Sequence, residues 1–174
     1  MIFRTPWGWM GILGANRGVR AIVLPQPSPR CLHVELRCFG HDPMERTKSG
    51  NQDISRILKR AQVQLTAYLE GKRKNLDFPI DLSGYTPFQL RVWEVTRSIP
   101  YGEVHSYGWV AERLGDSGYA RAVGNALGAN PVPLVVPCHR VIKQDGALGG
   151  FTAGLHFKTR LLKLEYNGRK PKEH

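Results

Sequence analysis

The sequence predicts a small α/β domain followed by a mostly helical domain that contains a helix-turn-helix. The first 38 residues carry strand-like alternation, and the residues from 53 to 70 repeat apolar side chains at helical spacing. Beyond residue 86, several short helical segments are separated by glycine and proline. The segment 72–83 reads as a connector, so we expect domains at 1–80 and 81–174.

The first domain is expected to contain a small antiparallel sheet and a helix. Trp9–Ala15 and Val19–Leu24 are strand-like, and Asn16-Arg17-Gly18 between them is a turn signal. The segment 25–29 carries three prolines and predicts a loop. A third strand is expected at Cys31–Phe39, where the apolar residues of one face are Leu32, Val34 and Leu36. The helix is expected at Asp53–Glu70, ended by Gly71.

The second domain should begin at Thr86-Pro87, a helix cap followed by a proline suited to the first helical position. The pattern predicts helices at 88–97, 106–114, 119–127 and 157–164. The second and third of these are joined by a tight turn with two glycines, which is the helix-turn-helix pattern. Asn130-Pro131-Val132-Pro133 cannot be helical, and a glycine-rich loop is expected at 146–154.

Composition narrows the class of protein. The 174 residues include 41% hydrophobic residues, which is ordinary for a globular chain, and the net charge is +11. Such an excess favours a polyanionic partner such as nucleic acid, although a basic solvated surface is the alternative. No apolar run reaches the roughly 18 residues of a membrane span, and no secretory signal is recognisable. Three cysteines argue against a disulfide framework, so a cytoplasmic protein is expected.

Four residues of metal-ligand type stand close together in the first half, namely Cys31, His33, Cys38 and His41. Their spacing matches no standard zinc site, so we expect no metal, and the sequence indicates no cofactor. A disulfide between the two cysteines would require the chain to bend, because seven residues of strand hold them too far apart.

Cys138 is the strongest candidate for chemistry. It is followed by His139 and Arg140, and a base or a positive charge nearby lowers the pKa of a thiol and so produces the reactive thiolate. The alternative is a small buried cysteine with no chemical role. The predicted helix 119–127 is rich in small residues, which allow close approach either to a partner or to another helix of the same protein. If DNA binds there, contacts to its backbone and shape should dominate.

The second half resembles the O6-alkylguanine-DNA alkyltransferase family from about Leu82 to Tyr166. The motifs that carry the resemblance are Ile99-Pro100-Tyr101-Gly102-Glu103-Val104-His105-Ser106-Tyr107, Ala120-Arg121-Ala122-Val123-Gly124, Gly128-Ala129-Asn130-Pro131-Val132-Pro133 and Pro137-Cys138-His139-Arg140-Val141-Ile142. The first half is similar only loosely. The resemblance implies an RNase H-like α/β domain before the helical one.

The resemblance also implies a reaction. Cys138 would attack the alkyl carbon of a flipped-out guanine, with His139, held by Glu165, taking the thiol proton through a water. Tyr107 would donate a proton or hydrogen bond to the departing guanine, and Asn130 would hold the active-site turn. The thioether product has no second nucleophile to cleave it, so the protein would act once. O6-alkylguanine in double-stranded DNA, and O4-alkylthymine, would be substrates of a monomer that does not bind membranes.

The family's DNA-contacting positions also map onto this sequence. Arg121 matches the residue that fills the place of the flipped base. Further DNA contacts would come from Ser106, Tyr119, Ala120, Gly124 and Arg140, and the alkyl pocket would be lined by Pro133, Val141, Phe151 and Thr152. Phe151 stands where many members have tyrosine, Thr152 where many have serine, and Ala153 where glycine is frequent, which affects the accepted alkyl size.

Three other functions remain alternatives. Alkyltransferase-like proteins bind the lesion without repair, but they lack the cysteine that Cys138 provides here. A helix-turn-helix regulator would leave the Pro-Cys-His-Arg segment unexplained. A cysteine hydrolase would need an oxyanion site and would turn over repeatedly.

Overall fold

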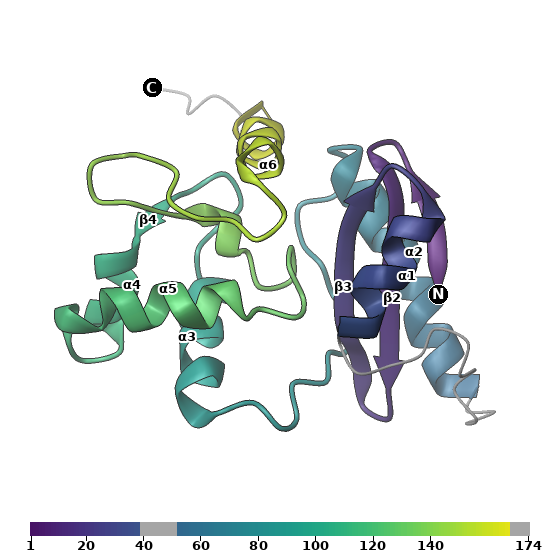
Figure 1. The fold of residues 1–174 in the computed structure, drawn as a ribbon, viewed down its shortest axis with the longest axis horizontal. Coiled ribbons are helices and arrows are strands. Elements are labelled where there is room, and N and C mark those ends of the chain that lie inside the picture. Colours follow the sequence, from purple (N-terminus) through teal and green to yellow (C-terminus); the bar gives the residue numbers. More distant parts are fainter. Residues whose placement is uncertain (39–51, 168–174) are drawn as a thin grey trace. The chain divides into compact units, whose positions relative to one another are not determined.

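The computed structural model describes residues 1–38 and 52–167 of the chain (Figure 1). Contacts divide the chain into two compact units: Met1–Ser83 with Pro131–Pro133, and Gly84–Asn130 with Leu134–His174. The expected division at residue 80 did not anticipate that three residues of the second half group with the first unit. In the described part of the chain, no helix is both long enough and apolar enough to cross a membrane.

Unit 1 is built on a three-stranded antiparallel sheet. Its strands follow one another in the order β1 (Ile2–Thr5), β2 (Gly8–Ala15) and β3 (Gly18–Gln26). The two predicted strands are confirmed, and β1 is an additional strand that the sequence analysis missed. Gly18 begins β3 with a φ of 153°, and a Cβ there would clash with the Pro79 carbonyl group, so only glycine fits.

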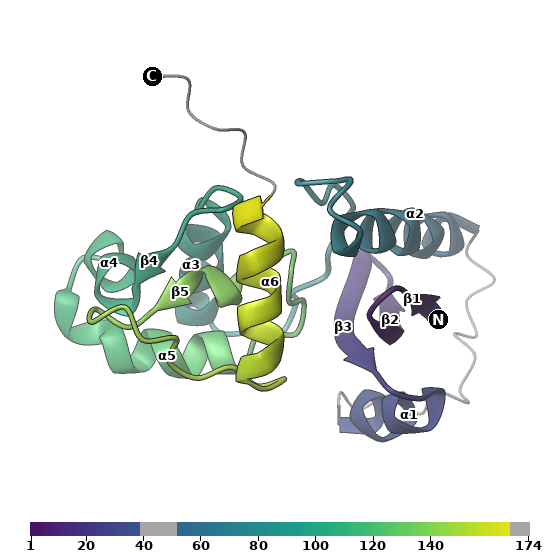
Figure 2. The ribbon, with the colours of Figure 1, turned by 90° about the horizontal axis from the view of Figure 1, so that it is seen from above.

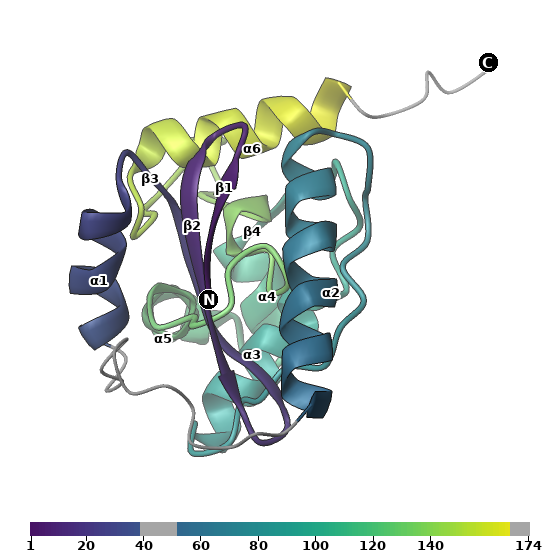
Figure 3. The same ribbon diagram turned by 90° about the vertical axis from the view of Figure 1, so that its right-hand side faces the viewer.

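Two helices cover opposite faces of this sheet (Figures 2 and 3). The helix α2 (Gln52–Leu69) confirms the predicted one, and Gly71 follows it with a φ of 72°. The other helix, α1 (Pro29–Cys38), occupies the segment predicted as a third strand, so that prediction was wrong. Leu32 and Leu36 are both buried against the sheet. They are four residues apart, and side chains at that spacing lie on the same face of a helix and also on the same face of a strand.

Cys31, His33 and Cys38, three of the four residues of metal-ligand type, belong to α1. Cys31 is exposed and has a free thiol, and His33 is exposed two residues later. His41 lies outside the described residues. Within residues 1–38 and 52–167, no group of three or more His, Cys, Asp or Glu side chains could hold a metal ion.

Unit 2 is mostly helical, as predicted. Its elements are α3 (Pro87–Arg97), β4 (His105–Ser106), α4 (Tyr107–Arg113), η1 (Ser117–Tyr119), α5 (Ala120–Gly128), η2 (Cys138–Arg140), β5 (Val141–Ile142) and α6 (Leu155–Asn167). The Thr86 side chain accepts a hydrogen bond from the Gln89 amide, and the Gln89 side chain accepts one from the Thr86 amide. This capping box confirms the predicted start of the domain's first helix.

Two long-range contacts join elements of unit 2. The indole of the buried Trp93, on α3, donates to the Ala126 carbonyl on α5 over 2.9 Å. The strands β4 and β5 pair in parallel, with His105 opposite Val141. This pairing, which the sequence analysis missed, connects the start of α4 to the residues that follow Cys138.

Candidate active site

Cys138 lies directly after a tight turn. Pro137 has φ −80° and ψ 63°, and the Cys138 amide donates to the Val136 carbonyl over 2.8 Å. These values describe an inverse γ-turn, for which the proline ring already supplies the required φ. The turn ends the buried run 134–136, and the partly exposed Cys138 begins the short helix η2.

Asn130 holds this turn from the other side of the loop. Its side-chain Nδ2 donates to the Val136 carbonyl over 2.9 Å and to the Cys138 Sγ over 3.3 Å. One amide therefore fixes the backbone before the cysteine and also contacts its sulfur. The contact agrees with the place that the sequence analysis expected for Asn130.

Behind Cys138 lies a buried polar cluster centred on Glu165 of α6. His139 Nε2 lies 2.6 Å from Glu165 Oε1, and the Arg140 Nε donates to Glu165 Oε2 over 2.9 Å. The Gly102 amide donates to the same Oε2 over 2.9 Å, and an Arg140 Nη donates to the Ile99 carbonyl over 2.7 Å. The expected contact between His139 and Glu165 is present.

This cluster sets the charges of its members. Burial raises the pKa of Glu165, but hydrogen bonds and charge from His139 and Arg140 outweigh it and lower that pKa to about 2. Burial lowers the pKa of His139, and the opposing effect of Glu165 does not reverse the shift. At neutral pH the cluster therefore holds an ionised carboxylate, a charged guanidinium and a neutral imidazole. The Nδ1 of this imidazole is buried and has no hydrogen-bond partner within the part of the chain that the structure describes.

Burial and neighbouring groups act in opposite directions on the pKa of the Cys138 thiol. Burial raises the pKa of the thiol, and the contact with Asn130 and the charge of Lys158 only reduce this shift. Neighbouring groups do lower the thiol pKa, as expected, but burial outweighs them, and the neighbour that supplies the positive charge is Lys158. The thiol stays protonated at neutral pH and needs a proton acceptor when it reacts.

Lys158 is a residue of the site that the sequence analysis missed. It is fully buried on α6, and its Nζ donates to the carbonyl oxygens of Val141 (2.6 Å), Leu148 and Gly150 (3.4 Å). Burial lowers its pKa to about 8, and a charged Cys138 raises it. A lysine in an amphipathic helix resembles any exposed lysine, so only the fold reveals that it anchors the glycine-rich loop.

Tyr107, the first residue of α4, lies between two glycines. A Cβ on Gly149, whose φ is 69°, would be 2.9 Å from the Tyr107 hydroxyl oxygen, and one on Gly124 of α5 would be 3.8 Å from its ring. Burial raises the pKa of Tyr107, and the charge of Cys138 adds to this shift. Its hydroxyl therefore keeps its proton at neutral pH and can act as a donor.

The residues expected at the DNA surface lie mostly on α5 or directly before α4 and α5. Arg121 is exposed one residue after the start of α5, and Tyr119 is 42% exposed with its ring edge-on to Phe88. The Ser106 hydroxyl caps α4 by accepting from the Trp109 amide over 3.0 Å. Ala120 is the first residue of α5 and half-buried. Gly124 is half-buried, and a Cβ there would lie 3.8 Å from the Tyr107 ring.

Arg140 does not belong to such a surface. It is 6% exposed, and its guanidinium is committed to Glu165 and to the Ile99 carbonyl. The expectation that it contacts DNA is therefore corrected, since an outward movement would leave a buried carboxylate without its cation.

The residues expected in the alkyl pocket lie at different depths. Val141 is fully buried in β5, while Phe151 and Pro133 are half-buried. Thr152 is exposed, and its hydroxyl donates to the Gly128 carbonyl over 3.3 Å. Pro133 is grouped with unit 1 and the other three with unit 2.

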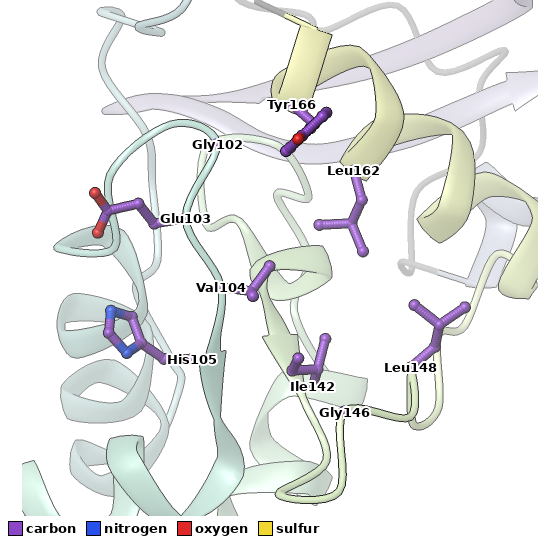
Figure 4. A pocket seen from close by; sticks show the side chains of 9 residues that line it. All are labelled: Gly102, Glu103, Val104, His105, Ile142, Gly146, Leu148, Leu162 and Tyr166. Atoms are coloured by element: carbon purple, nitrogen blue, oxygen red, sulfur yellow. The ribbon is translucent and has the colours of Figure 1, made fainter. Parts of the chain in front are cut away.

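Unit 2 also has a hollow of about 560 Å³, across which Val104, Ile142 and Leu162 face one another (Figure 4). Its lining is completed by Gly102, Glu103, His105, Gly146, Leu148 and Tyr166. It includes neither Cys138 nor the residues predicted for the alkyl pocket, so it is a separate feature.

Comparison with known proteins identifies the family. A model described as the DNA-binding domain of 6-O-methylguanine DNA methyltransferase matches residues 87–167, the region that holds the whole cluster around Cys138. A methylated-DNA–protein-cysteine methyltransferase of Mycolicibacterium paratuberculosis is 47% identical over 121 residues, covering 70% of this chain and 73% of that relative. The chain belongs to this family.

Further methylated-DNA–protein-cysteine methyltransferases are similar to this chain. The inducible one of Bacillus subtilis is 50% identical over 103 residues, which are 59% of this chain but only 57% of that relative. Among solved structures, the Mycobacterium tuberculosis protein OGT in complex with DNA is 32% identical, with a TM-score of 0.74, and the match covers 98% of this chain and 94% of that one. The family likeness in structure therefore extends over both units.

Proposed function

We propose that this protein repairs DNA by direct reversal, transferring the alkyl group of O6-alkylguanine, and of O4-alkylthymine, to the sulfur of Cys138. The observation that carries the proposal is the contact of Cys138 with Asn130, in a chain whose next residue, His139, is paired with Glu165. A nucleophile, a base and a carboxylate that orients the base form the arrangement by which proteins activate a cysteine.

The reaction is a displacement at saturated carbon. As the bond from sulfur to the alkyl carbon forms, the bond from that carbon to O6 breaks, and its electron pair passes to guanine. The thiol proton goes to His139 Nδ1 through a water, because Nε2 is committed to Glu165. A neutral His139 suits this role, since an imidazole that is already protonated cannot accept the thiol proton.

Tyr107 acts on the leaving group. Its hydroxyl, kept protonated by the raised pKa, donates a proton or hydrogen bond to the guanine as negative charge develops there. Charge from Lys158 supports the sulfur while it loses its proton. The thioether is stable, so each molecule acts once.

The alkylated base must leave the duplex before Cys138 can reach it. We propose that α4 and α5 form a helix-turn-helix that enters the minor groove and that Arg121 fills the vacated place in the stack. Ser106, Tyr119 and Ala120 then contact the DNA backbone. The small residues of α5 allow close approach, although Gly124 also accommodates Tyr107 within the unit.

Pro133, Val141, Phe151 and Thr152 are proposed to shape the alkyl pocket, with Phe151 as an aromatic wall. Unit 1 corresponds in this proposal to the family's RNase H-like domain. We place the reaction in a monomer in the cytoplasm, where a reducing environment preserves the Cys138 thiol.

The test is the intact mass of the protein after incubation with duplex DNA containing O6-methylguanine. We expect each chain to gain the mass of one methylene, mapped by peptide analysis to Cys138, and the Cys138→Ala variant to gain nothing. A binding protein would show no adduct, and a hydrolase would regenerate its cysteine. Absence of an adduct on Cys138 would sink the proposal.

A further inference from the structure

The hollow of about 560 Å³ in unit 2 has an apolar interior that is open to solvent. Figure 4 shows the side chains of Val104, Ile142 and Leu162 around this interior, with the Tyr166 ring at one end. Val104 is 42% exposed and Tyr166 is 72% exposed, although both are large hydrophobic residues. Contiguous apolar surface in contact with water is uncommon on a soluble protein and often marks a place where a partner binds.

Helix α6 forms the wall of the hollow that carries Leu162 and Tyr166, and two rows of side chains run along its outer side. Residues spaced by three and four positions share one face of a helix. The row beside the hollow consists of Leu155, Thr159, Leu162 and Tyr166. The adjacent row, whose members are all exposed, consists of His156, Arg160, Lys163 and Asn167. A mainly apolar row and a basic row therefore lie side by side on α6.

The charge of this surface is positive. Glu165 is the one acidic residue of α6, every residue of which the structure describes, and it is fully buried against His139 and Arg140. Glu103 lines the hollow, but Figure 4 shows its side chain pointing away from the three apolar side chains of the interior. Since the whole chain has a net charge of +11, the partner that complements the basic row is a polyanion.

Single-stranded DNA is the polyanion that matches both rows. Its phosphates pair with lysine and arginine side chains, and its unpaired bases present flat apolar faces that stack on aromatic rings. The bases of a duplex already stack on one another, so a duplex could use the basic row but would leave the Tyr166 ring and the hollow unfilled.

We propose that the outer side of α6 and the adjoining hollow form a second DNA site, which binds single strands without preference for sequence. Arg160 and Lys163 contact phosphates, Tyr166 stacks on a base, and the hollow receives the apolar face of the next base. Within unit 2, α3, α4 and α5 pack against one another and α6 packs against η2 (Figure 1), so this site is distinct from the proposed helix-turn-helix. It lets the protein hold unpaired DNA while α5 engages a duplex, and it does not depend on Cys138 as the alkyl acceptor.

The site is tested with the full chain and a fluorescein-labelled oligothymidylate of about 12 nucleotides, within the usual range for one single-strand site. Fluorescence anisotropy is measured in the presence of saturating blunt-ended duplex without lesions, which occupies the helix-turn-helix. We expect the oligothymidylate to bind under these conditions, and an abasic oligomer of the same length to bind at least about fivefold more weakly because it has no base to stack. Loss of binding when duplex is present would show that the two ligands share one site and would overturn the inference.

An acidic peptide is the competing occupant of this surface. Poly-glutamate with the same number of charges should bind far more weakly than the oligothymidylate, since it offers charge but no aromatic face. Equal or tighter binding of poly-glutamate would make the surface a docking site for a protein, and the inference would be wrong.

The aromatic ring is tested by comparing Tyr166→Leu with Tyr166→Phe. Both remove the hydroxyl, but only leucine removes the flat face. Tyr166→Leu should raise the dissociation constant for the oligothymidylate roughly tenfold, and Tyr166→Phe should stay within about twofold of the unaltered protein. Because this side chain is 72% exposed, neither change should move the midpoint of urea unfolding. Equal affinities of the two variants would exclude stacking on Tyr166 and refute the proposal.

The basic row is tested with Lys163→Gln and a matched control, Lys59→Gln, which alters an exposed lysine of α2. A lysine that binds one phosphate of a single strand contributes about 0.7 to the slope of log affinity against log salt concentration. Lys163→Gln should lower the slope for the oligothymidylate by about this amount, whereas Lys59→Gln should leave it unchanged. Both variants should bind the duplex within about twofold of the unaltered protein. Equal slopes in the two variants would contradict phosphate binding by α6 and overturn the inference.

Discussion

Glu165 lies 26 residues after His139 in the chain, yet its Oε1 is 2.6 Å from His139 Nε2 and both side chains are fully buried. The same carboxylate accepts from Arg140 through both of its oxygens. One side chain of α6 therefore holds the imidazole that we propose as the base and neutralises Arg140, the residue that follows it. The proposed catalytic role of His139 and the stability of unit 2 should therefore depend on the same buried carboxylate.

Replacing this carboxylate should destabilise the protein. Glu165→Gln leaves the buried Arg140 without its counter-charge, and breaking a buried pair in this way costs about 3–5 kcal/mol. Urea unfolding gives the free energy of unfolding. The control is Asp53→Asn, which removes the exposed partner of Arg56 and should cost less than about 1 kcal/mol. Similar losses in the two variants would contradict the role assigned to Glu165.

Stability should also fall in acid through the same group. The pKa of Glu165 is about 2 in the folded protein and near its ordinary value of 4.5 in the unfolded chain. A lowered folded pKa stabilises the protein above pH 4.5, and this contribution is lost as the pH falls from 4.5 to 2. The difference in unfolding free energy between the unaltered protein and Glu165→Gln should therefore be constant above pH 5 and shrink below it. A difference that does not change with pH would show that Glu165 is not ionised in the fold.

Lys158 should affect the ionisation of Cys138. Replacing it with methionine removes a positive charge that lowers the thiol pKa, so the pH profile of Cys138 alkylation by iodoacetamide should move to higher pH. Three carbonyl oxygens lose their donor, which should also cost about 1–3 kcal/mol of stability. Lys163→Met, on an exposed position of the same helix, is the control. A profile that coincides with that of the control would refute the electrostatic role.

The Tyr107 hydroxyl should matter for reaction more than for stability. Tyr107→Phe keeps the ring between Gly124 and Gly149 but removes the donor to the leaving group, so the rate of alkyl transfer should fall at least roughly tenfold. The unfolding midpoint should change little. Tyr166→Phe removes a hydroxyl from a 72% exposed side chain and should react as the unaltered protein does. An unchanged rate in Tyr107→Phe would exclude the donor role.

Arg121 is expected to act only on duplex DNA. Arg121→Ala should slow repair of O6-methylguanine in a duplex while leaving the reaction with free O6-benzylguanine unchanged, because the free base needs no flipping. Arg97→Ala removes an exposed arginine from α3 and controls for lost charge. Adduct formation measured on both substrates decides the matter, and equal slowing on the two would count against a flipping role.

The helices were predictable where local signals agree. Thr86, Pro87 and Gln89 form a capping box within four residues, and α2 has a long apolar period followed by Gly71. The segment that forms α1 was misread because Leu32 and Leu36 suit a strand face and a helix face equally. The β4–β5 pair was missed because strands of two residues leave no periodic signal.

The sequence by itself pointed to Cys138 as the candidate nucleophile and predicted the order of the helices, because motifs and caps are formed by neighbours along the chain. Only the tertiary structure decided the state of Cys138, whose thiol is protonated because burial outweighs its charged neighbours. It also turned Arg140 inward, buried Lys158 beneath the loop and joined Pro131–Pro133 to the first unit. Burial and pairing depend on residues far apart in sequence, and no local pattern records them.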